Sequence, residues 1–190
     1  PSSGAEHVLS HFWDFQHELY DAPKNLHGAQ VAIGTLISLT MYNFLRQFQP
    51  GHFNISKIIR NRPNLSQIQS QNLSKFGDAG HYLNQVISQK WLPDHTLEIY
   101  LNELMMHWEE IWEDLDFFIT SPALIYKAFS EAGVPSTLSA ISRSKDEALD
   151  SLVYGNRYRK RFTILDLFWE LGLLPEVADE ILLRSGVLGG

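Results

Sequence analysis

Three histidines near the start of the chain have the spacing of metal ligands. His7 and His11 are four residues apart, so in a helix they lie on one face, one turn from each other. His27 precedes Gly28 and a long apolar stretch over 31–48, and a turn between the two segments would return it towards His7. Imidazole is the commonest metal ligand and suits zinc, iron and nickel. The spacing therefore predicts a divalent-metal site.

The alternative is that these histidines only pack or face solvent, which is the commoner role of any single histidine on a half-apolar helix. A catalytic metal typically takes three protein ligands and keeps one position open. We assign His7 and His27 as ligands and His11 as an outer partner of these ligands or a proton relay, with His17 as a weaker fourth candidate. No carboxylate ligand is identified from the sequence.

Other candidate groups are interpreted mainly as structural. The acidic residues between 109 and 116 are typical of a solvated helix face. Gly28 is interpreted as a point of backbone access to a ligand, whereas Gly34 and the small residues near it favour close helix packing. The basic run at 157–161 could grip a phosphate through guanidinium forks. From spacing alone, its favoured role is to offset helix dipoles or lie along the surface.

Two motifs and one late segment carry a resemblance to a known family. The motifs are Ser-Gly-Ala-Glu-His-x-x-Ser-His-Phe-Trp at 3–13 and Leu-His-Gly-x-x-Val-x-x-Gly-Thr at 26–35, and the segment is Arg-Phe-Thr-Ile-Leu-Asp at 161–166. They resemble the metal-binding region of the iron-dependent alcohol dehydrogenase and dehydroquinate synthase superfamily. Within it they are most similar to the sn-glycerol-1-phosphate dehydrogenases of the AraM type. The likeness covers both ends of the chain and is vague over 55–89.

The resemblance implies a site with one aspartate and two histidine ligands. The two histidines match His7 and His27, and His11 matches a histidine near the reacting carbon. It also implies that Glu6 orients an imidazole and that Arg161 binds the substrate phosphate. The family's aspartate lies upstream of the first motif, so we expect that ligand outside this chain.

The implied reaction is the reduction of dihydroxyacetone phosphate, a phosphorylated three-carbon substrate, to glycerol 1-phosphate. The implied cofactors are a divalent metal (zinc, iron or nickel) and NAD(H) or NADP(H). The family binds the nicotinamide cofactor mainly through an N-terminal nucleotide-binding domain, and no strand followed by Gly-x-Gly-x-x-Gly occurs here. We therefore expect residues 1–190 to be the C-terminal helical domain of a longer enzyme, inactive alone and homodimeric in full.

Two other functions stay open. A glycerol or polyol dehydrogenase-like domain would keep the site and lose the preference for phosphate. A non-catalytic helical dimerisation module would bind no metal at all. Metal analysis of the purified protein distinguishes this module from the two dehydrogenases.

Composition narrows the class of protein. The 190 residues are 44% hydrophobic and 12% aromatic, enough to bury one core in a single domain. A net charge of -7 argues against a nucleic-acid partner. The absence of cysteine excludes disulfide and thiolate chemistry. We expect no membrane span and no signal peptide, and a cytoplasmic protein.

Apolar periodicity predicts an all-α protein, and the resemblance implies the multi-helix C-terminal domain of a dehydroquinate synthase-like fold. The main expected helices cover 4–20, 28–49 and 95–118, with a break at 21–25 around Pro23. Ser121-Pro122 and Thr163 with Asp166 are expected to start two more helices, and Pro175 a last one. Residues 52–90 are rich in Gln, Asn and Ser and are interpreted as short helices in an inserted surface segment.

Overall fold

Helices make up the regular structure of the protein. The computed structural model describes residues 4–21 and 25–189, and these contain eleven α-helices, four short 3-10 helices and no strand. The prediction of an all-α protein is confirmed. The α-helices are α1 (Ala5–Tyr20), α2 (His27–Leu45), α3 (Ile55–Asn61), α4 (Leu65–Phe76), α5 (Gly80–Lys90), α6 (Asp94–Met106), α7 (Trp108–Asp116), α8 (Pro122–Glu131), α9 (Lys145–Tyr154), α10 (Ile164–Glu170) and α11 (Ala178–Arg184).

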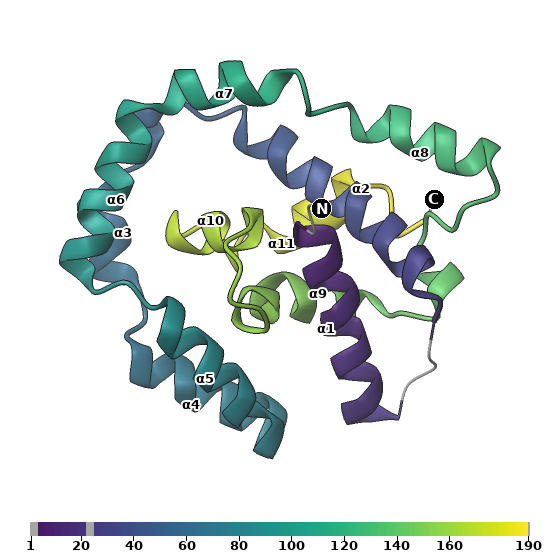
Figure 1. Cartoon of the computed structure of the whole chain (residues 1–190), viewed down its shortest axis with the longest axis horizontal. Coiled ribbons are helices and arrows are strands. Elements are labelled where there is room, and N and C mark those ends of the chain that lie inside the picture. The colour runs from purple at the N-terminus through teal and green to yellow at the C-terminus, as the bar shows by residue number, and fades with distance from the viewer. Residues whose placement is uncertain (1–3, 22–24, 190) are drawn as a thin grey trace.

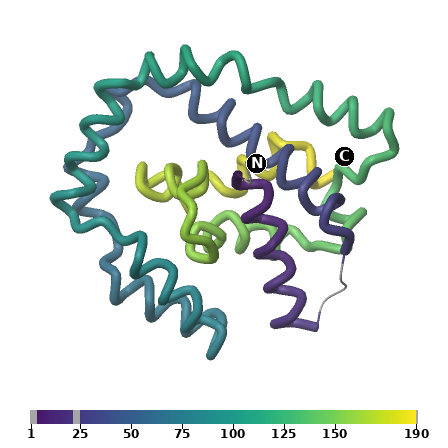
Figure 2. Tube along the Cα trace, in the orientation of Figure 1, coloured from purple at the N-terminus to yellow at the C-terminus, as the bar shows by residue number. Residues whose placement is uncertain are grey.

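The helices fall into an inner group and an outer arc. In Figure 1, α1 and α2 lie near α9, α10 and α11, while the chain from α3 to α8 runs around them. The tube in Figure 2 shows the same course, with α3 beside α6 and α4 beside α5 at one side of the molecule. α2 packs against α1, α8, α10 and α11. One hydrophobic core therefore joins both ends of the chain to α2.

α1 and α2 pack closely against each other. A Cβ added at Gly34 would lie 2.7 Å from the carbonyl oxygen of Glu6, so only glycine allows this approach of the two backbones. The prediction that Gly34 serves packing is confirmed. Leu9 and Trp13 of α1 and Ile33 of α2 are fully buried between the helices and the rest of the core. This contact fixes the relation between the two histidine-bearing segments.

α2 is apolar nearly all round, as expected for a central helix. It ends at Leu45, a few residues earlier than predicted, because the following residues close into turns. By length and composition alone α2 could cross a membrane, but 61% of its most apolar window is buried inside the protein.

The prediction of a single helix over 95–118 is wrong. His107 leaves helical angles, with φ −98° and ψ 15°, and separates α6 from α7. The break turns Trp108 into the core, where its indole N–H donates to the carbonyl oxygen of Phe48 at 3.1 Å. Apolar spacing alone does not show such a break, because the stripe continues through it.

The polar segment between 52 and 90 is folded. Its middle forms the α4–α5 hairpin, and Asn64 and Gln67 cap α4 by exchanging hydrogen bonds between side chains and backbone. A second capping box, formed by Thr163 and Asp166, starts α10 as predicted. The last helix begins at Ala178 instead of Pro175, because residues 175–177 form a turn. The predicted break around Pro23 falls partly on residues 22–24, outside the described residues.

Candidate metal centre

The three predicted histidines lie together where α1 meets the start of α2. The ring centroids of His7 and His27 are 5.1 Å apart, and those of His11 and His27 are 5.3 Å apart. The His7 and His11 centroids are separated by 6.4 Å. His7 and His11 are half-buried and His27 is exposed, so solvent and small molecules can reach the cluster.

A hydrogen-bonded chain behind His27 defines its tautomer. Ser10 Oγ lies 2.9 Å from His27 Nδ1 and donates its single proton to Gln30 Oε1 at 2.8 Å. Ser10 must then accept from His27, so Nδ1 carries the hydrogen and Nε2 keeps the lone pair. Ser10 and Gln30 are fully buried, which holds this arrangement in place. Such an outer partner is the usual way to orient an imidazole ligand.

A carboxylate joins the cluster from one turn beyond His11. Asp14 Oδ2 lies 3.7 Å from His11 Nδ1. Ligand atoms of His11, Asp14 and His27 all fall within 4.8 Å of one another, which makes them a possible set of metal ligands. Asp14 was not singled out from the sequence. Its i+3 spacing from His11 was the available signal, since such residues share a helix face.

Electrostatics favours an uncharged His11. Burial lowers its pKa, and the positive charge of Arg159 lowers it further. His27 acts in the same direction, whereas Asp14 opposes the shift. Because the ordinary histidine pKa is near 6.5, the ring is neutral at pH 7 and keeps a lone pair for a metal or a proton.

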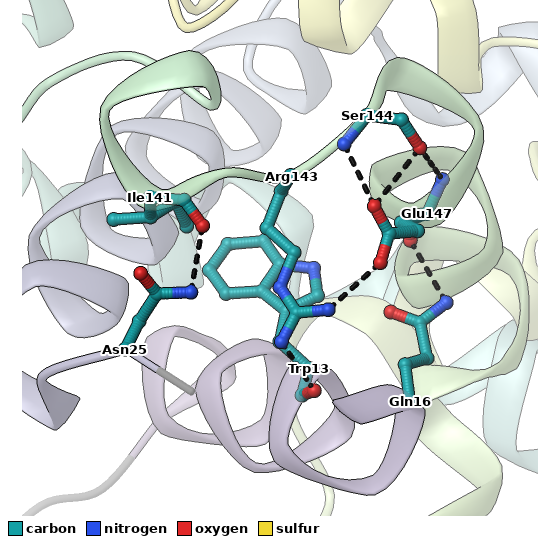
Figure 3. Close-up of polar contacts among 7 residues, drawn as sticks. All are labelled: Trp13, Gln16, Asn25, Ile141, Arg143, Ser144 and Glu147. Carbon is teal, nitrogen blue, oxygen red and sulfur yellow. Dashed lines mark hydrogen bonds and ion pairs between the residues drawn. The ribbon is translucent and has the colours of Figure 1, made fainter. Parts of the chain in front are cut away.

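A buried arginine fixes α1 against the segment that leads into α9 (Figure 3). Arg143 donates to the carbonyl oxygen of Trp13 at 2.8 Å and to Glu147 Oε1 at 2.7 Å. Glu147 also closes the capping box of α9 with Ser144. Close to His27, the Asn25 amide donates to the carbonyl oxygen of Ile141 at 2.6 Å. These contacts position α1, which carries His7 and His11, and the start of α2, which carries His27.

The remaining predicted residues have other surroundings. Glu6 accepts a hydrogen bond from the backbone N–H of Gly4 at 2.7 Å, at the start of α1. A Cβ at Gly28 would meet nothing within 4 Å, so its backbone borders open space. His17 is half-buried towards the end of α1.

Arg161 is exposed, and its carbonyl oxygen accepts from Lys90 Nζ at 3.3 Å. The basic residue whose charge acts on His11 is Arg159.

The acidic group on α7 has the surroundings of a solvated face, as interpreted from the sequence. Its carboxylates are exposed, and Asp116 pairs with Arg46. His107 Nδ1 lies 2.9 Å from Glu110 Oε2 at the helix start.

No protein-family model, curated protein or solved structure matches this chain. The family resemblance therefore stays a prediction, and the geometry of the histidine cluster is the structural observation that bears on function.

Proposed function

We propose that this chain is the helical metal- and substrate-binding domain of a metal-dependent, NAD(P)-linked sn-glycerol-1-phosphate dehydrogenase with a dehydroquinate synthase-like fold. The observation that carries the proposal is the grouping of His7, His11 and His27, whose ring centroids lie between 5.1 and 6.4 Å from one another, with His27 oriented by Ser10. Histidines that serve only packing need no such grouping. The two motifs in the sequence supply the reaction class.

The donor set fits a divalent ion of the zinc, iron or nickel type, which accepts imidazole nitrogen and carboxylate oxygen. His27 belongs to both sets that the cluster offers. In the first, His7 and His27 are ligands and the acid comes from elsewhere. In the second, His11 and Asp14 complete the set with His27. We favour the first, because it leaves His11 available for the substrate.

The chemistry follows from the charges around the cluster. A divalent ion supplies Lewis-acid polarisation of a substrate carbonyl, which favours hydride transfer from a nicotinamide cofactor. His11 is held neutral, and with its Nδ1–H facing Asp14 its Nε2 keeps the lone pair through which it can accept and pass on a proton. Arg159 adds a positive charge that acts on His11 and could attract the phosphate of a substrate bound there. That charge favours dihydroxyacetone phosphate over an uncharged polyol.

Zinc binding by variants of the histidines and of Asp14 tests the proposal. Isothermal titration of the metal-free protein with zinc should give one site. His27→Ala should abolish it, because His27 is in both sets. His7→Ala should weaken binding far more than Asp14→Asn if the favoured set is right, and the reverse order would select the second set. His95→Ala is the matched control, since His95 is exposed on α6, and should bind like the wild type.

Turnover is measured on the natural full-length protein, as oxidation of NADH or NADPH with dihydroxyacetone phosphate. His11→Asn should retain zinc and lose most activity. Zinc retention by His27→Ala would reject the metal site. Equal activity with dihydroxyacetone and its phosphate would favour the polyol enzyme, and a protein without zinc or turnover would be the helical dimerisation module.

A further inference from the structure

A cavity lies apart from the cluster of His7, His11 and His27 and is built by other elements. It has a volume of about 450 Å³, within the range of small-molecule sites. One wall comes from α3 and the turn before it, and the other from the connector between α10 and α11. Its apolar walls include the residues Phe48, Phe53, Ile58, Leu171, Leu173 and Leu174.

Two residues that line this cavity carry buried hydrogen-bond donors without acceptors among the described residues. The Arg62 side chain is only 6% exposed, and its Nε has no hydrogen-bond partner among the described residues. Trp169 Nε1 is likewise buried and without a partner in the described part of the chain. Both residues line the same cavity. Because a buried donor is costly to leave unpaired, the pair indicates a ligand that accepts hydrogen bonds.

The neighbours of Arg62 engage only part of its guanidinium, whose central carbon lies 3.7 Å from the centre of the Trp91 ring. Nη1 donates to the carbonyl oxygen of Leu92 at 2.7 Å, and Asp94, 3.7 Å away, has a largely exposed carboxylate. Nη2 lies 3.4 Å from Glu170 Oε2 without forming a hydrogen bond. Burial raises the pKa of Glu170 to about 7, so near neutral pH this carboxyl is only partly ionised. A ligand carboxylate would complete the neutralisation.

We infer that the cavity between α3 and the α10–α11 connector binds a small carboxylate with an apolar or aromatic body. The carboxylate would accept from Arg62 and Trp169, since charge-assisted bonds to guanidinium are among the strongest that proteins form. The aliphatic and aromatic walls would cover the rest of the molecule. This site is independent of the proposed dehydrogenase function.

Phenylacetate is a suitable probe, observed through the indole resonances in ¹H–¹⁵N spectra of the whole chain. The Trp169 resonance, assigned with Trp169→Phe, should shift and saturate at millimolar phenylacetate. Phenylacetamide and phenethylammonium have the same aromatic body without the negative charge, and should bind at least about tenfold more weakly. This comparison needs no variant, so it does not depend on the folding of a mutant.

Two variants sharpen the test. Arg62→Gln should weaken phenylacetate binding by about tenfold or more, and Ile58→Phe, which fills the cavity, should also reduce it. Arg60→Gln is the matched control, because Arg60 is exposed near the end of α3, two residues before Arg62, and does not line this cavity. The inference is overturned by an unshifted Trp169 resonance, by equal responses to the acid and the amide, or by undiminished binding in Arg62→Gln.

Discussion

The histidine cluster and the buried ionic network beside α10 show two ways in which this chain gathers polar side chains. The cluster comes from two consecutive helices and includes an exposed His27. The network pairs Lys90 with Asp166 and Arg62 with Glu170. All four side chains are at most 11% exposed. Its members come from α5, the residue after α3, and α10.

Exposure separates the roles of the two regions. Half-exposed imidazoles can exchange protons and ligands with solvent at little cost. Buried ions need their protein partners, because each loses its hydration and is stabilised only by the groups around it. The network also serves the cluster, since Lys90 Nζ donates to the carbonyl oxygens of Asn156 at 2.7 Å and Arg159 at 3.0 Å. It therefore holds the segment that carries the charge near His11.

The largest effect should follow removal of Lys90. Lys90→Met leaves Asp166 buried without its cation and frees three backbone carbonyl groups. We expect a loss of about 3–5 kcal/mol in the free energy of unfolding, measured with urea. Lys127→Met is the control, because the Lys127 side chain is 72% exposed, and should change stability by less than about 0.5 kcal/mol. Similar losses in both variants would erase the contrast between buried and exposed charges.

A smaller effect should appear in the pH dependence of stability. The pKa of Glu170 rises from 4.5 to about 7 in the folded protein, mainly through burial and despite the opposing charge of Arg62. Between these two pH values the folded state binds more protons than the unfolded state. The contribution of Glu170 to stability is therefore complete below pH 4.5 and is lost as pH rises through about 7. The loss is at most about 3 kcal/mol.

Glu170→Gln should flatten this part of the curve, measured by urea unfolding at several pH values. Glu98→Gln, at an exposed position on α6, should leave it unchanged. A variant curve with the wild-type slope between pH 4.5 and 7 would show that Glu170 titrates normally.

The smallest change concerns the partner of His27. Ser10→Ala removes the acceptor for the Nδ1 hydrogen, so the imidazole is no longer held in its tautomer and orientation. We expect zinc affinity to fall by about 10-fold to 100-fold in a calorimetric titration, with folding retained. Ser38→Ala is the matched control, since Ser38 is a buried serine of α2 whose Oγ has no partner among the described residues. Equal affinities in the two variants would mean that Ser10 does not support a ligand.

Local spacing was enough to predict several features. His7 and His11 share a face because helix geometry repeats within four residues. Thr163 and Asp166 start α10 through a capping box that spans three residues. Ser121 followed by Pro122 starts α8, because proline at the first helical position needs no backbone N–H partner. Each feature depends on neighbours in the chain.

Only the tertiary structure decided the rest. It broke the helix expected over 95–118 at His107, and it placed the charge of Arg159 where it lowers the pKa of His11. It also brought Arg62 to Glu170 across more than a hundred residues. Caps and helix faces are set by hydrogen bonds and spacings within one or two turns, which a sequence displays directly. Contacts between distant segments depend on how all the apolar faces pack at once, and no short motif records that outcome.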